Sequence, residues 1–212
     1  MNTASRRPVP YITAWSAEQP IRAAIIANPR KPGIAYLHET PHDRDTFGVL
    51  WGTYGIGRGK GRPLLGTVHP QRQRRAMGSL LCQVCAGPAD RIEQGVLWLL
   101  DGDVPEREGE ITPHPPVCLH CALLAVRFCP ELRRGYTAVR VKTPTIDGVL
   151  GMTYRPAFPQ PVAHVTELVQ YTNPASRWVL ASQLVATLRG CTTVSLDDLA
   201  ADHGRRRAAL TR

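Results

Sequence analysis

The chain has 212 residues, of which 43% are hydrophobic and 20% are charged, so it can bury an ordinary core and is not expected to be disordered throughout. No apolar run approaches the roughly 20 residues that a membrane span requires, and the first residues lack the apolar segment of a secretory signal. Six cysteines are too few for a disulfide scaffold at this length. We therefore expect a soluble, cytoplasmic protein without a membrane partner.

Positive charge dominates and is unevenly distributed. The net charge is +9, from 26 Lys and Arg against 17 Asp and Glu. Residues 1–89 and 111–212 carry balances of +8 and +6, whereas residues 90–110 carry −5. This alternation predicts an electropositive surface interrupted by one acidic element. All but three of the basic residues are arginine, whose planar fork suits phosphate recognition, although GC-rich coding would also enrich arginine.

The predicted elements are short because 19 prolines and 18 glycines interrupt the chain. In chain order, the residue patterns predict a helix over 17–27 capped by Ser16, strands over 33–38, 47–54 and 64–68, a helix over 72–81, a strand over 95–100 and a helix over 118–128. They then predict a hairpin of strands 136–142 and 148–154 that turns at 144–147, and strand structure over 162–171. Last come a helix over 175–189 with Asn173 as N-cap and Gly190 past its end, a helix over 196–202 capped by Ser195, and a frayed basic tail.

Two C-x-x-C pairs give the strongest chemical signal. Cys82 and Cys85 form the first pair, and Cys118 and Cys121 form the second, with 32 residues between Cys85 and Cys118. Two pairs at this spacing can complete a closed tetrahedral site, so we predict a structural zinc ion held by these four thiolates. His120 could replace one ligand. Cys129 and Cys191 stand alone and are expected to pack in the core.

The segment 81–130 resembles the treble-clef zinc proteins, including the zinc-stapled members of the HNH nuclease family. The resemblance covers the knuckle around the first pair, a hairpin, and a helix that carries the second pair. It implies the four metal ligands and no catalytic residue, because Gly102 stands where that family has its general-base histidine. The chain also resembles actinobacterial proteins of uncharacterised function, which implies no activity.

These patterns together predict an α+β protein of short antiparallel strands, with a central treble-clef zinc module and a helical C-terminal region. We expect a strand-rich basic N-terminal region at 1–76, the four-cysteine module at 77–135, and a hairpin followed by helices at 136–212. These three parts are expected to form one compact unit.

A second motif resembles a zinc-binding sequence, but its proline prevents the helix that zinc binding requires. Residues 38–42 read His-Glu-Thr-Pro-His, which matches H-E-x-x-H. That motif binds zinc only on a helix, and Pro41 would clash inside one. We therefore expect a surface turn that carries His38 and His42.

The glycine-rich segment 55–62 is also basic and has two interpretations. It fails the P-loop pattern because a glycine follows Lys60. It is either a mobile hairpin tip or a loop whose N–H groups and cations hold phosphates. Residues 58–75 contain six positive side chains and no acid, which are Arg58, Lys60, Arg62, Arg72, Arg74 and Arg75. We take these six as candidate nucleic-acid contacts.

The leading functional hypothesis is therefore a zinc-stapled binding protein that contacts DNA or RNA through arginine-rich surface. One alternative is an enzyme that acts on an anionic small molecule and uses zinc only structurally. Another is a protein–protein adaptor that uses the acidic stretch from Asp101 to Glu110, which is expected to be a solvated loop. The sequence identifies no catalytic residue.

Overall fold

The computed structural model describes residues 8–21, 23–104 and 106–210. It is a mixed α+β fold that is richer in strand than in helix. The strands are β1 (Thr13–Trp15), β2 (Ile25–Ala27), β3 (Ile34–Tyr36), β4 (Leu50–Trp51), β5 (Pro63–Val68), β6 (Arg91–Ile92), β7 (Gly95–Asp101), β8 (Ile111–Thr112), β9 (Tyr136–Arg155), β10 (Val162–Gln170) and β11 (Val179–Val194). The helices are α1 (Pro70–Gly78), α2 (Leu119–Phe128) and α3 (Leu196–Leu210), with 3-10 turns η1 (Pro41–Asp43) and η2 (Pro174–Trp178).

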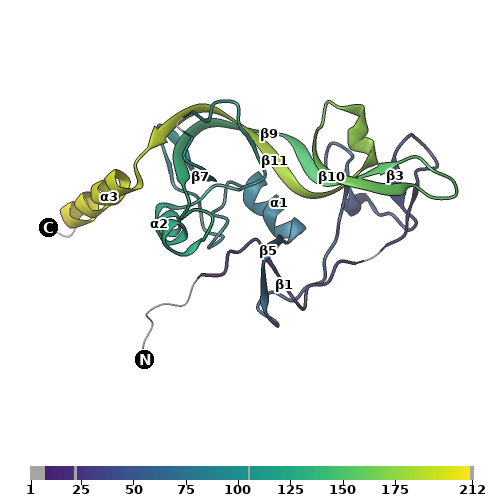
Figure 1. Ribbon diagram of the computed structural model, residues 1–212, viewed down its shortest axis with the longest axis horizontal. Coiled ribbons are helices and arrows are strands. Elements are labelled where there is room, and N and C mark those ends of the chain that lie inside the picture. Colours follow the sequence, from purple (N-terminus) through teal and green to yellow (C-terminus); the bar gives the residue numbers. More distant parts are fainter. Residues whose placement is uncertain (1–7, 22, 105, 211–212) are drawn as a thin grey trace.

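A long antiparallel ribbon of β9 and β11 organises the molecule (Figure 1). It belongs to a seven-stranded sheet in the order β4-β11-β9-β7-β6, in which β10 also pairs with β9 and β8 with β11. The pairs are antiparallel except for the parallel pair of β4 and β11. Figure 1 shows α2 and α3 toward one end of this ribbon and β10 and β3 toward the other.

The ribbon corrects two predictions. Residues 144–147 do not turn, because β9 runs straight through them. Leu188 lies opposite Pro144 on β11, but its N–H donates to the carbonyl of Glu110 and its carbonyl accepts the N–H of Gly109. The strand is therefore compatible with Pro144, because Leu188 needs no N–H from the proline. The predicted helix over 175–189 is also wrong, because only η2 is helical and β11 follows it.

The periodicity of β11 explains the second error. Register shifts fall between Ala181 and Gln183 and between Val185 and Ala186. Each shift interrupts the two-residue alternation of a strand, so the apolar residues fall at spacings that also fit a helix. The N-cap prediction was correct locally, since the Asn173 side chain accepts the N–H of Ala175.

Most of the other elements follow the predictions more closely, with one exception near the N-terminus. The helix α2 forms within one residue of the prediction. The helix α1 also forms, but it begins at Pro70 and ends at Gly78 instead of spanning 72–81, and α3 begins after Ser195 but extends to Leu210 instead of ending at residue 202 with a frayed tail. The predicted strands over 33–38 and 47–54 shorten to β3 and β4. The predicted helix over 17–27 is wrong: Pro20 bridges to Tyr54, and β2 pairs with β3.

The sheet is buried on both faces at the strand β7. Trp98 and its alternating neighbours on β7 join the main core with Met77 of α1, whereas Leu97 and Leu99 join a second core with α2. Gln73, fully buried, fixes α1 to the sheet: its amide nitrogen donates to the carbonyl of Leu184 at 2.9 Å, and its amide oxygen accepts the N–H of Leu184 at 2.9 Å. The four cysteines of the two C-x-x-C pairs and the basic helix α1 are thus held on one framework.

Candidate metal centre and basic surface

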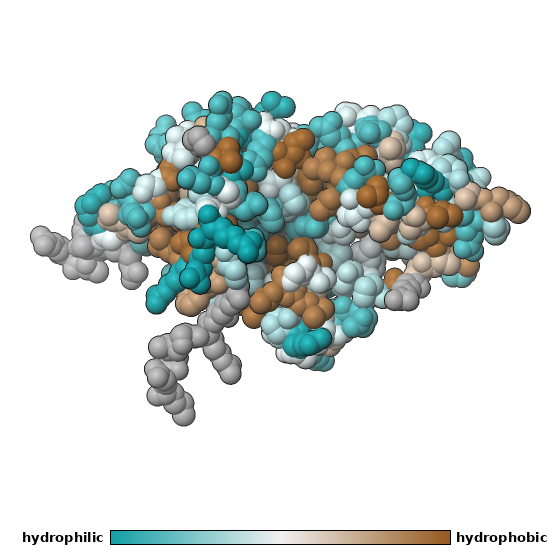
Figure 2. Space-filling model, in the orientation of Figure 1, coloured by the Kyte–Doolittle hydropathy of each residue, from teal (hydrophilic) through white to brown (hydrophobic). Residues whose placement is uncertain are grey.

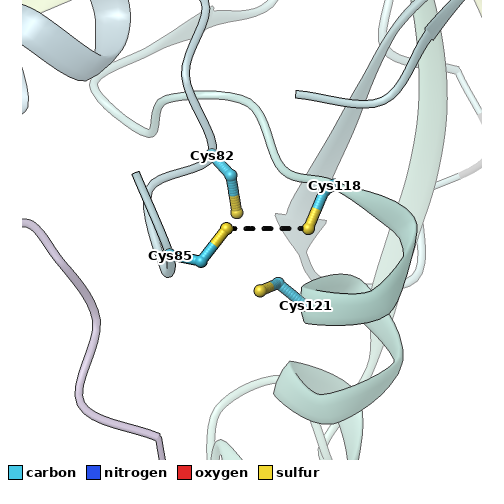
Figure 3. Close-up of side chains that lie close together, drawn as sticks. All are labelled: Cys82, Cys85, Cys118 and Cys121. Carbon is cyan, nitrogen blue, oxygen red and sulfur yellow. Dashed lines mark hydrogen bonds between the residues drawn. The ribbon is translucent and has the colours of Figure 1, made fainter. Parts of the chain in front are cut away.

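The structure brings the four predicted cysteines together. Their sulfur atoms all lie within 4.8 Å of one another, and the Cys85 and Cys118 sulfurs are 3.9 Å apart. Figure 3 shows the four side chains pointing toward a common point. Tetrahedral Zn–S bonds of about 2.3 Å separate the sulfurs by roughly 3.8 Å, so the cluster could hold a metal ion of this size.

Local backbone conformation places the first pair in a tight turn. The N–H of Ala86 donates to the carbonyl of Cys82, and the N–H of Cys82 donates to the carbonyl of Gly87. Ala86 occupies the left-handed region with φ of 63°. This turn folds the chain back so that both thiols of the C-x-x-C pair face the same side.

The second pair lies at the beginning of α2. Cys118 is the N-cap residue and Cys121 is in the first turn, so the helix dipole favours negative charge on both sulfurs. The two pairs are also tied directly, because the N–H of Gln83 donates to the carbonyl of Pro116 at 3.0 Å. Between them, β6 and β7 form an antiparallel pair. The observed order is therefore a knuckle turn, a β hairpin and a helix.

The thiols differ in their electrostatics. Burial raises the pKa of Cys118 to about 11 and raises that of Cys121 well above its usual value. Burial opposes ionisation of Cys85 as well, but a hydrogen bond from the Gly87 N–H and bonds from the neighbouring thiols lower its pKa overall. Four thiolates at this place need a compensating cation. Thiolates are the soft donors that zinc prefers.

The other candidate ligands lie elsewhere. In the described part of the chain, no further group of three or more His, Cys, Asp or Glu side chains could hold a metal ion. His120 is exposed and outside the cluster. His38 precedes the 3-10 turn η1, which contains His42, so the H-E-x-x-H letters lie on a turn as predicted. Cys191 packs against the main core, and Cys129 is half-buried at the end of α2.

Arg72 is not part of an exposed basic surface, which corrects one predicted contact. Its guanidinium is buried and bonds both carboxylate oxygens of Glu18, at 2.6 and 2.7 Å. It also donates to the carbonyl of Thr13. The Glu18 side chain is only 1% exposed, so this pair neutralises its own charge and leaves Arg72 unavailable to a phosphate.

The glycine-rich loop is ordered by its packing. The N–H of Ser16 donates to the carbonyl of Arg62, and the N–H of Arg62 donates to the Ser16 hydroxyl at 3.0 Å. Gly61 has φ of 78°, a left-handed conformation that favours glycine, and a Cβ there would lie 2.2 Å from that hydroxyl. These contacts anchor the end of the loop at Arg62, and Arg58, Lys60 and Arg62 are all exposed.

The remaining predicted cations have different surroundings. Arg75 is exposed on α1, and Arg74 is half-buried with its guanidinium 4.8 Å from the centre of the Trp51 ring. Arg58 lies 5.1 Å from the centre of the Tyr11 ring. The structure therefore separates the six predicted residues into four exposed ones, one that rests on a tryptophan, and one buried ion pair.

The acidic stretch is less free than predicted. Arg107 is buried and bonds Glu110 at 2.7 Å, and the Glu108 carboxylate accepts the N–H groups of Gly190 and Cys191. These contacts fasten the segment to β11, although most of its acidic side chains remain exposed.

Sequence reasoning missed Glu18 as the partner of Arg72. The only available signal was that Glu18 is the single acid in the first 38 residues, which does not reveal its partner 54 positions away.

Comparison with known proteins identifies no relative: no family model, curated protein or solved structure matches the chain. No helix in the described ranges is long and apolar enough to cross a membrane. The candidate function therefore depends on the site itself.

Proposed function

We propose that residues 81–130 form a treble-clef module around one structural zinc ion. The support is the convergence of four sulfurs within 4.8 Å together with the order of knuckle, hairpin and helix. Four thiolates close the coordination sphere, so the ion stabilises the fold and binds no substrate. Elemental analysis of protein purified without chelator tests this. One zinc per chain supports the proposal, and the absence of stoichiometric metal contradicts it.

We further propose that this zinc-stapled protein binds nucleic acid through the exposed cations Arg58, Lys60, Arg62 and Arg75. The observation that carries this proposal is the glycine loop, which holds three of these side chains on an anchored backbone. In addition, residues 46–89 contain no acidic side chain, so nothing within this segment competes for the cations. A held basic loop can approach a phosphate backbone without a large ordering cost.

The test is a salt titration of binding to a DNA or RNA oligonucleotide. Each phosphate contact contributes a slope of roughly 0.9 in log affinity against log salt, so four contacts predict about a hundredfold loss of affinity between 50 and 200 mM salt. Retention that ignores salt would contradict the proposal. No retention on either nucleic acid, combined with a saturable thermal shift by a small anion, would instead favour the enzyme alternative.

A further inference from the structure

Phe47 presents an open aromatic face. Its ring stacks on the ring of Tyr171, with centroids 3.9 Å apart and planes inclined by 16°. Phe47 is nevertheless 61% exposed, so the face turned away from Tyr171 is open to solvent. A large exposed aromatic side chain that is stacked on one side offers the other side to a planar ligand.

Asp45 holds this stack in position. One of its carboxylate oxygens accepts the hydroxyl of Tyr171 at 2.9 Å and the indole N–H of Trp51 at 3.0 Å. The other accepts the backbone N–H groups of Phe47 at 3.0 Å and Val49 at 2.9 Å. The carboxylate is thus fully engaged beneath the stack. The backbone that carries Phe47 is already ordered, which lowers the entropy cost of binding a ligand there.

Cations connect this stack to the basic loop across α1. Residues on a helix advance by about 100° each, so Arg74 and Arg72 lie on opposite edges of α1 and the exposed Arg75 lies between them. At one edge, Arg74 rests on Trp51, which shares Asp45 with the stack. At the other edge, Arg72 lies 6.0 Å from the Tyr11 ring, which also carries Arg58.

Aromatic and cationic side chains lie together around α1, with Arg74 on Trp51 and Arg58 on Tyr11. In Figure 2, apolar residues form patches over the middle of the molecule with hydrophilic residues between them. A purely apolar partner would leave Arg74 and Arg75 unpaired. An aromatic face beside cations instead matches the way single-stranded nucleic acids are bound, with bases stacked on rings and phosphates on basic side chains. In a duplex the bases are already stacked and cannot reach such a face.

We propose that Phe47 is a base-stacking platform and that the nucleic acid bound by this protein is single-stranded, with phosphates leading from Arg74 and Arg75 to the basic loop. This inference rests on the proposed nucleic-acid function. It adds that the nucleic acid is single-stranded and that Phe47 contributes affinity by stacking on a base instead of by charge.

The experiment compares two probes of equal length and charge: a single-stranded oligo-dT and an abasic oligonucleotide with the same phosphate backbone. The wild-type chain should bind oligo-dT about tenfold more tightly, because one stacked base contributes on that scale. Phe47→Ala and Phe47→Leu should remove this preference while leaving affinity for the abasic strand unchanged. Phe47→Trp should retain it. Phe158→Ala is the matched control, because Phe158 is a phenylalanine that is 99% exposed in the connection between β9 and β10 and should not affect binding.

The outcomes separate this inference from the proposed function. Equal binding of the two probes by the wild type, or an unchanged preference in both Phe47→Ala and Phe47→Leu, overturns the stacking role while the basic surface stands. Tighter binding of a duplex of the same length overturns the single-strand assignment. If neither probe binds at low salt, both proposals fail. Circular dichroism of each variant establishes that the fold is retained.

Discussion

Replacing Arg72 or Arg75 by alanine should produce opposite effects, although both were predicted from the sequence as nucleic-acid contacts. Arg72→Ala removes the guanidinium that neutralises the buried Glu18 carboxylate, which costs about 3–5 kcal/mol. For a chain of this size that lowers the midpoint of thermal unfolding by roughly 10 °C. Arg75→Ala removes an exposed side chain, so stability should change by less than about 0.5 kcal/mol, but the salt slope of binding to a single strand should fall by about 0.7, the contribution of one phosphate contact.

Thermal unfolding and salt titration of both variants give the comparison. The double variant Glu18→Leu, Arg72→Met is the control for the ion pair: an apolar pair of similar volume should recover much of the lost stability, because no charge remains buried. The reasoning is refuted if Arg72→Ala unfolds at the wild-type temperature. It is equally refuted if folded Arg72→Ala lowers the salt slope as much as Arg75→Ala does.

Three further expectations follow from the structure. Cys82→Ser should lose the zinc equivalent and the ordered central module, since structural zinc contributes on the order of 10 kcal/mol in isolated modules, and elemental analysis with hydrogen exchange checks this. His38→Ala with His42→Ala should leave metal content unchanged, and loss of an equivalent would show a second site. Burial and Arg72 lower the pKa of His69, and the bond from Arg72 lowers the pKa of Glu18. The contribution of each group to stability is therefore fully present at pH values above the pKa that the group has in the unfolded chain. That stability should be lost as pH falls, first below about 6.5 for His69 and then below about 4.5 for Glu18, and flat stability from pH 7 to 4 would contradict this.

The four-cysteine cluster could be predicted because its information is local. Two C-x-x-C pairs specify donor type and spacing directly, and Cys118 at a helix start is recognisable from the apolar pattern after it. No knowledge of the tertiary fold was needed to group the four ligands.

The ribbon could not be predicted because its determinants are distant. Whether residues 179–194 form a helix or a strand is decided by pairing with β9, and the bulges that hide the strand periodicity exist only in that pairing. The role of Arg72 is equally non-local, since its partner lies 54 residues earlier. A run of cations thus predicts an exposed basic face only where none of them forms an ion pair with a buried acid.

The turn around Cys82 and Cys85, which is the candidate metal knuckle, and the basic loop are joined by a short chain of contacts. The knuckle carbonyls of Val84 and Gln83 accept the N–H groups of Tyr11 and Ile12, at 2.9 and 3.3 Å. The Tyr11 ring then supports Arg58 of the loop. Since an ion would fix the knuckle that receives these bonds, a structural metal with no contact to the proposed ligand would still determine where Arg58 lies. A closed four-cysteine site and a ligand-binding surface are in this way compatible within one small fold.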